Sequence, residues 1–128
     1  MTPATTAHNR RALVVDDSIA MRRMLTFALN SWGFEVAEGG NGVEGLQLLR
    51  EATADLIVAD VNMPEMDGLT FVRRVRSLPG HRFTPVLMLT TESTSAKVEE
   101  GRAAGATGWL VKPFKPERLL EVVRKILP

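Results

Sequence analysis

Four short apolar stretches of this chain each end in a polar side chain that can react or bind an ion. They are Leu-Val-Val-Asp-Asp at residues 13–17, Leu-Ile-Val-Ala-Asp at 56–60, Val-Leu-Met-Leu-Thr at 86–90 and Trp-Leu-Val-Lys-Pro at 109–113. Apolar runs of this length that alternate with helical patterns are typical of strands in a parallel α/β sheet. The carboxyl ends of such strands meet at one crevice, where functional groups gather. The sequence therefore predicts that three carboxylates, a hydroxyl and an amine share this crevice.

The intervening segments carry apolar residues at helical spacing, which predicts five βα units. These segments lie within residues 21–32, 43–49, 69–75, 93–104 and 119–127. The first helix follows Asp17 and Ser18, either of which could cap it, and ends near Gly33. The fourth helix is the weakest, since it has Val98 but few other large apolar residues, and Gly101 costs about 1 kcal/mol of helix propensity relative to alanine. We expect the fourth helix to be the most adjustable element.

Residues 34–38 differ from the other predicted strands, because apolar and polar side chains alternate there. This pattern is typical of a strand exposed on one face, which places it at an edge of the sheet. Right-handed crossovers leave few topologies, and the flavodoxin-like order 2-1-3-4-5, with helices on both faces, puts the second strand at the edge. Asp16, Asp17 and Asp60 would then face each other across the switch point.

The composition agrees with one folded domain. The chain has 128 residues, of which 45% are hydrophobic, enough for one core and too few for two. Residues 10–128 are predicted to form this domain, and the polar residues 1–9 a flexible tail without the apolar core of a signal peptide. No apolar stretch is long enough to span a bilayer. We expect a monomeric cytoplasmic protein.

Charge and cysteine content exclude other classes of function. The formal charge of +1 lacks the one-sided basic field that nonspecific nucleic-acid binding requires. The arginine pairs at residues 10–11, 22–23 and 73–74 are interpreted as solvated surface. The absence of cysteine excludes disulfides and thiolate metal sites.

Three carboxylates in one partly dehydrated cleft require a cation nearby. A pair about 4 Å apart repels by about 4 kcal/mol at an effective dielectric constant of about 20. An all-oxygen site suits Mg²⁺, which proteins usually hold with one or two carboxylates, waters and a phosphate oxygen. Lys112 adds a fixed positive charge and Thr90 a hydroxyl donor, groups that stabilise a phosphoryl group during transfer. Asp60, on the central third strand, is the candidate nucleophile, since an aspartate can carry an acyl phosphate.

Two motifs suggest other ligands, and both fit less well. Residues 60–65 lack the glycine that a calcium-binding EF-hand loop requires at its sixth position. Residues 40–45 match the dinucleotide fingerprint G-x-G-x-x-G, follow a predicted strand and open a predicted helix. However, that strand alternates like an edge strand, and the chain is too short for two mononucleotide halves and a substrate domain. These glycines are better interpreted as a turn and a helix start.

Four segments of the chain carry the motifs of a known family. They are Val-Val-Asp-Asp-Ser at residues 14–18, Asp-Val-Asn-Met-Pro-Glu-Met-Asp-Gly at 60–68, Leu-Thr-Thr-Glu at 89–92 and Val-Lys-Pro-Phe at 111–114. In their order and spacing they resemble the receiver domains of bacterial two-component response regulators. Within that family the chain is similar to stand-alone chemotaxis regulators of the CheY type, which also have the 2-1-3-4-5 order. The resemblance implies a signalling switch rather than an enzyme that acts on other substrates.

The resemblance also implies a role for each polar residue of the crevice. Asp60 would accept a phosphoryl group from the phosphohistidine of a histidine kinase. Mg²⁺ would be held by the side chains of Asp17 and Asp60 and by the backbone carbonyl of Asn62, and Asp16 would act through a metal-bound water. Lys112 would pair with Asp60 and then with the phosphoryl group.

For signalling, the resemblance implies that the phosphoryl group draws in Thr90 and Lys112 and that the aromatic residue of the fifth strand swings inward. That residue is Trp109 here, where chemotaxis regulators most often have tyrosine. Indole is bulkier than phenol and is only a hydrogen-bond donor. The alternative interpretation is that Trp109 is a packing residue that never moves.

The loops near the phosphorylation site carry further implied features. The Lys112–Pro113 bond would be cis, and Pro64 and Gly68 would shape the loop after Asp60. Asn62 and Glu92 flank the site as in fast-resetting chemotaxis regulators, which implies a short phosphoryl lifetime.

The expected partners are a histidine kinase, a downstream target protein such as a flagellar motor switch, and a phosphatase. One alternative is an intermediate relay that passes the phosphoryl group to another histidine protein. A second alternative is a small aspartyl phosphatase. Enzymes of the haloacid-dehalogenase type typically have a second aspartate two residues after the nucleophile, where it acts as general acid. The residue at this position is Asn62, which cannot serve as a general acid.

Overall fold

The computed structural model describes residues 10–92 and 94–128, within which five strands alternate with five helices. In chain order they are β1 (Arg11–Val15), α2 (Ile19–Ser31), β2 (Glu35–Gly39), α3 (Gly42–Glu51), β3 (Leu56–Asp60), α4 (Gly68–Arg76), β4 (Val86–Thr90), α5 (Ser95–Ala104), β5 (Gly108–Val111) and α6 (Pro116–Ile126). The predicted tail, residues 1–9, lies outside the described residues, as does Ser93 at the predicted start of the fourth helix.

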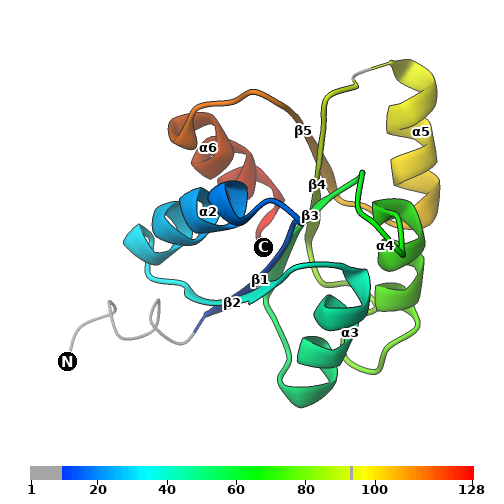
Figure 1. Ribbon diagram of the computed structural model, residues 1–128, viewed down its shortest axis with the longest axis horizontal. Helices are drawn as coiled ribbons and strands as arrows, with labels where there is room; N and C mark the ends of the chain where they lie inside the picture. Colours follow the sequence, from blue (N-terminus) through cyan, green and yellow to red (C-terminus); the bar gives the residue numbers. More distant parts are fainter. Residues whose placement is uncertain (1–9, 93) are drawn as a thin grey trace.

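The strands form one parallel sheet in the order β2-β1-β3-β4-β5, which confirms the predicted topology. Helices α2 and α6 cover one face, and α3, α4 and α5 cover the other (Figure 1). Because successive side chains of a strand point to opposite faces, Val14 packs in the core beneath α2 and α6, whereas Leu13 and Val15 pack beneath the other three helices. Strands covered on both faces are largely apolar, and β3 and β4 are buried along their whole length with a polar residue only at the last position.

The helices begin where short polar side chains can cap them. Ser18 caps α2, since its hydroxyl accepts a hydrogen bond from the Met21 amide at 3.2 Å. Gly33 follows the end of this helix with a φ of 92°, a left-handed conformation that glycine adopts without strain. Thr94 caps α5 in the same way as Ser18 caps α2.

The edge strand β2 is shifted by one residue from the prediction. It runs from Glu35 to Gly39, so Phe34 precedes it and is buried in the core rather than lying within the strand. In α3, Leu46 is buried, but Val43 is 50% exposed because it lies on the side of the helix away from the sheet. In the described part of the chain, every helix falls short of the length and apolar character that crossing a membrane requires.

Candidate phosphoryl-transfer site

The carboxyl ends of β1 and β3 bring the three predicted carboxylates together. Asp16, Asp17 and Asp60 each offer a carboxylate oxygen, and these oxygens all lie within 4.8 Å of one another. Asp16 and Asp60 are buried, whereas Asp17 is exposed. The Asp16 Oδ1 atom accepts a hydrogen bond from the Ser18 amide at 2.9 Å. The parallel pairing of β1 and β3 thus builds the acidic crevice that their sequences predicted.

Lys112 brings its ammonium group into this crevice from the end of β5. Its Nζ atom lies 3.1 Å from Asp60 Oδ2 and 3.9 Å from Asp16 Oδ2. The lysine side chain is 20% exposed, so its charge acts in a partly dehydrated setting. One ammonium group leaves the three carboxylates with a net negative charge.

The electrostatics of Asp16 favour a cation beside its carboxylate. Burial raises the pKa of the Asp16 carboxyl, the Ser18 amide lowers it, and the neighbouring charge of Asp60 raises it. Its Oδ2 atom is buried and accepts no hydrogen bond from the described residues. An all-oxygen cluster with such an atom fits a hard divalent cation, and Mg²⁺ in particular. The residues present therefore fit the predicted metal.

Thr90 lies at the end of β4 and is buried. Its Oγ1 atom accepts a hydrogen bond from the Glu92 amide at 3.0 Å, and its carbonyl oxygen accepts one from the Lys112 amide at 2.7 Å. Thr90 therefore connects the loop after β4 to the end of β5.

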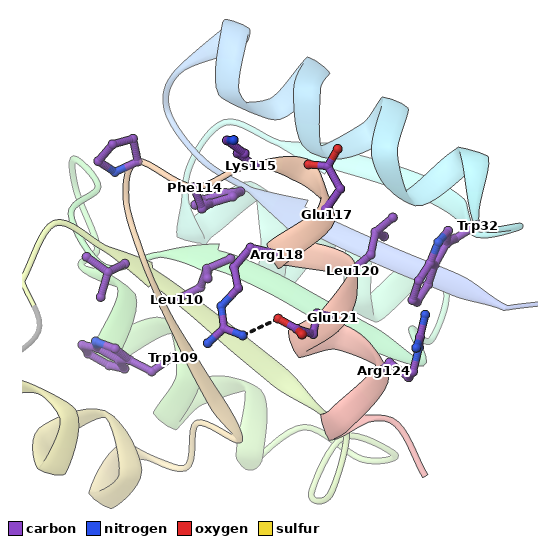
Figure 2. Close-up of a pocket in the computed structure, with 12 residues that line it drawn as sticks. Trp32, Trp109, Leu110, Phe114, Lys115, Glu117, Arg118, Leu120, Glu121 and Arg124 are labelled. Carbon is purple, nitrogen blue, oxygen red and sulfur yellow. Dashed lines mark hydrogen bonds and ion pairs between the residues drawn. The ribbon is translucent and has the colours of Figure 1, made fainter.

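Trp109 of β5 points its indole ring toward α5 (Figure 2). The Nε1 atom donates a hydrogen bond to the Glu92 carbonyl oxygen at 3.2 Å, and the ring packs against Gly101. Trp109 and Thr90 thus both bond to the backbone of Glu92, which lies two residues after Thr90 in the loop that follows β4. The predicted switch residue therefore contacts both α5 and the loop that follows β4.

Two of the implied loop features, the cis bond before Pro113 and the glycine at position 68, are present. The Lys112–Pro113 bond is cis. The Asn62 amide lies 3.4 Å from Asp60 Oδ1, and the Gly68 amide donates to the Val61 carbonyl oxygen at 2.7 Å. A Cβ on Gly68 would lie 2.7 Å from Val61 Cα, so only glycine fits this approach of α4 to the end of β3.

The sequence interpretation of Arg22 was wrong. It assigned both arginines of the 22–23 pair to solvated surface, but the Arg22 side chain is only 18% exposed, while Arg23 is 76% exposed. The Nη1 atom of Arg22 donates to the Asp16 carbonyl oxygen at 2.7 Å. The only available signal was the position of Arg22 on the helix that begins at the crevice.

A groove of about 830 Å³ lies beside the site, along β5 and α6 (Figure 2). Trp109 lines one end of it and Trp32 the other, and an ion pair between Arg118 and Glu121 lies between them. The residues that line it do not include the three carboxylates. The groove and the acidic crevice are therefore neighbouring features joined by β5.

The family model that describes the response regulator receiver domain matches residues 12–124. The chain is 42% identical over 120 residues to the chemotaxis protein CheY1 of Helicobacter pylori, covering 91% of this chain and 96% of that protein. It is 39% identical over 119 residues to the chemotaxis protein CheY homolog of Campylobacter jejuni, with 91% and 92% covered. The chemotaxis protein CheY4 of Vibrio cholerae has a similar structure, with a TM-score of 0.89, 48% identity and coverage of 92% of this chain and 98% of that one.

The chain therefore belongs to the receiver domain family of response regulators, the signalling proteins of two-component systems. Its relatives include the CheY chemotaxis proteins. Receiver domains bind Mg²⁺ through acidic residues and carry their signal as a phosphoaspartate, and they work with a histidine kinase and a downstream target. The acidic cluster of the crevice has the composition that this chemistry requires.

Proposed function

We propose that this protein is a single-domain response regulator, formed by residues 10–128, that is phosphorylated on Asp60 by a histidine kinase. The observation that carries the proposal is the setting of Asp60, at the end of the central strand. Its Oδ2 atom lies 3.1 Å from Lys112 Nζ, and it shares the crevice with two further carboxylates. A carboxylate suited to act as nucleophile, a lysine ammonium group and a cluster of oxygen ligands suited to a cation thus lie together, which supports the proposal.

In the proposed reaction a carboxylate oxygen of Asp60 attacks phosphorus, and the phosphorus–nitrogen bond of the phosphohistidine breaks. The imidazole leaves with the bonding electron pair and takes up a proton. Asp17, Asp60 and the backbone carbonyl of Asn62 would hold Mg²⁺, and Asp16 would act through a water. When bound, the ion supplies positive charge to the phosphoryl oxygens. Lys112 stabilises the charge that develops on the transferred group.

The signal would pass from Asp60 to β5. A phosphoryl group adds about −1.5 to −2 charges and three strong acceptor oxygens. It would attract the Lys112 ammonium group, which lies 3.1 Å from Asp60 Oδ2, and the hydroxyl of Thr90, which follows the register partner of Asp60 on β4. Because Thr90 and Trp109 both bond to the Glu92 backbone, a shift of Thr90 would change the setting of Trp109. Trp109 lines the groove along β5 and α6, where we propose that the target protein binds.

Chemotaxis is the proposed pathway, the cytoplasm the proposed location and the flagellar motor switch the proposed class of target. The support is the similarity to CheY proteins over almost the full length of both chains. The other proposed partners are a histidine kinase and a phosphatase.

The proposal is tested by incubating the protein with Mg²⁺ and acetyl phosphate and measuring the intact mass. We expect the mass of one phosphoryl group to be added, with the modified peptide containing Asp60. Asp60→Asn should abolish the addition. The control Asp55→Asn should not, because Asp55 lies just before the start of β3, at the end of the strand away from Asp60. Addition to Asp60→Asn would contradict the proposal. Repeated turnover of a phosphate ester would instead favour a phosphatase, and transfer to a second histidine protein a relay.

A further inference from the structure

Arg22 holds the backbone of the acidic segment at the end of β1. It lies in the first turn of α2, and its Nη1 atom donates to the Asp16 carbonyl oxygen at 2.7 Å. The same guanidinium group meets Glu38 of β2, with 3.3 Å between Nε and Oε1. Arg22 therefore spans from the edge strand to the residue that enters the crevice.

Glu38 is itself held on its other oxygen. The Thr26 hydroxyl donates to Glu38 Oε2 at 2.9 Å, and the glutamate side chain is only 23% exposed. The Asp16 amide also donates to the Gly39 carbonyl oxygen at 3.1 Å. The backbone of Asp16 is thus hydrogen-bonded on both sides: its amide bonds to β2, and its carbonyl oxygen bonds to Arg22. The backbone that carries the Asp16 carboxylate is therefore held by a network that includes α2, β1 and β2.

We propose that Arg22 is a positioning residue for the cation site, which it serves by holding the Asp16 backbone so that the carboxylates of Asp16 and Asp17 converge with Asp60. This inference rests on the metal site of the proposed function. Glu38 offsets the charge of Arg22, so the guanidinium group can orient the segment with little repulsion of a cation in the crevice. Groups that orient metal ligands typically affect metal affinity by about 10–100-fold.

Arg23 provides a matched control within the same helix. It carries the same charge and lies 3.9 Å from the same Glu38 oxygen, but its side chain is 76% exposed. The hydrogen bond to the Asp16 carbonyl oxygen comes from Arg22. Substitution of either arginine by glutamine removes one positive charge near the crevice, but only the change at position 22 removes the hold on Asp16.

The test is calorimetric titration of Mg²⁺ into the wild-type protein and into Arg22→Gln, Arg22→Lys and Arg23→Gln. We expect Arg22→Gln to weaken Mg²⁺ binding by about tenfold and Arg23→Gln to change it by less than about twofold, because an exposed charge is screened. If Arg22 acted only through its charge, its removal would strengthen Mg²⁺ binding. Arg22→Lys, which keeps the charge but not the planar two-sided contact, should weaken binding as well.

Two further variants separate this inference from the metal site itself. Thr26→Val removes the hydrogen bond that holds Glu38 without changing a charge, and it should weaken Mg²⁺ binding as Arg22→Gln does. Urea unfolding checks that each variant is folded. If Arg22→Gln proves unstable, Thr26→Val still tests the network. Unchanged or tighter binding in both Arg22→Gln and Thr26→Val would overturn the role of Arg22. Asp17→Asn should abolish binding. Saturable binding that persists in Asp17→Asn, or none in the wild type, would overturn the proposed metal site.

Discussion

The six-membered ring of Trp109 lies directly against Gly101 of α5. A Cβ on Gly101 would stand 2.9 Å from Cε3 of the indole, 3.2 Å from Cη2 and closer still to Cζ3. Real Cβ atoms essentially never come within 3.0 Å of another heavy atom, so the indole occupies space that any side chain at position 101 would need. The glycine that weakens this helix therefore has a packing role, and it allows the large aromatic residue to bond to the Glu92 carbonyl oxygen.

Gly101→Ala should destabilise the protein, although alanine favours a helix over glycine by about 1 kcal/mol. The added methyl group overpacks the contact with Trp109, which typically costs about 1–3 kcal/mol. Urea unfolding measures the change in stability. The fluorescence of Trp109 in a Trp32→Phe background should also change, since the indole has to leave its place on α5.

The matched control is the same substitution in a Trp109→Ala background. There the steric conflict is absent, so Gly101→Ala should stabilise the protein through its helix propensity. Stabilisation by Gly101→Ala in both backgrounds would show that the ring of Trp109 does not constrain position 101.

The sheet and the acidic crevice could be predicted because their signals are local. The apolar runs that end at Asp16, Asp60 and Thr90 each indicate a parallel strand that is buried on both faces. The polar residue at each end marks the edge where the strands meet. Strand order then follows from the handedness of the connections and from the half-exposed β2, although the start of that strand at Glu35 was missed by one residue.

The contacts of Gly101 and Arg22 could not be predicted, because each depends on which residue from another element lies opposite. A glycine within a helix and an arginine on its surface have the same local pattern whether they are solvated or packed. Arg22 and Arg23 are adjacent and chemically identical, yet only Arg22 points to the crevice. Such differences arise from tertiary packing, which the periodicity of one helix does not record.

Asp16→Asn should stabilise the protein in the absence of divalent cations. Burial, the main cause, raises the pKa of this carboxyl, so the ionised form at neutral pH costs stability, and this cost disappears as the pH falls through the pKa of the folded state. Asparagine removes the charge and can still accept the Ser18 hydrogen bond. We expect a gain of about 0.5–2 kcal/mol in urea unfolding at neutral pH. The gain should shrink in acid; a loss of stability at neutral pH would contradict it.

Arg76→Met should destabilise the end of the molecule opposite the crevice. The Arg76 guanidinium group donates to the backbone carbonyl oxygens of His81 at 3.0 Å, Thr84 at 2.6 Å and Gly105 at 2.6 and 3.0 Å. Methionine keeps the apolar stem but leaves these carbonyls without their donor, at an expected cost of about 2–3 kcal/mol. Urea unfolding measures this cost. Arg73→Met, on the exposed side of the same helix, should change stability by less than about 0.5 kcal/mol. Equal effects of the two substitutions would refute the bridging role of Arg76.

Because of His81, the protein should be less stable in mild acid than at neutral pH. The imidazole is 1% exposed, its Nδ1 atom lies 3.0 Å from Thr84 Oγ1, and its Nε2 atom has no hydrogen-bond partner among the described residues. Burial, and secondarily the charge of Arg76, lowers the pKa of this histidine. The unfolded chain therefore binds the proton first, and stability is lost as the pH falls below about 6.5 and on toward the lower pKa of the folded state.

The loss is measured by urea unfolding at about pH 7.5 and about pH 5.5, on either side of the unfolded pKa of histidine. Asp16→Asn is the suitable background, because the raised pKa of Asp16 acts in the opposite direction. In that background His81→Leu should remove most of the difference in stability between the two pH values, since leucine takes up no proton. An undiminished difference in His81→Leu would assign the acid sensitivity to other groups.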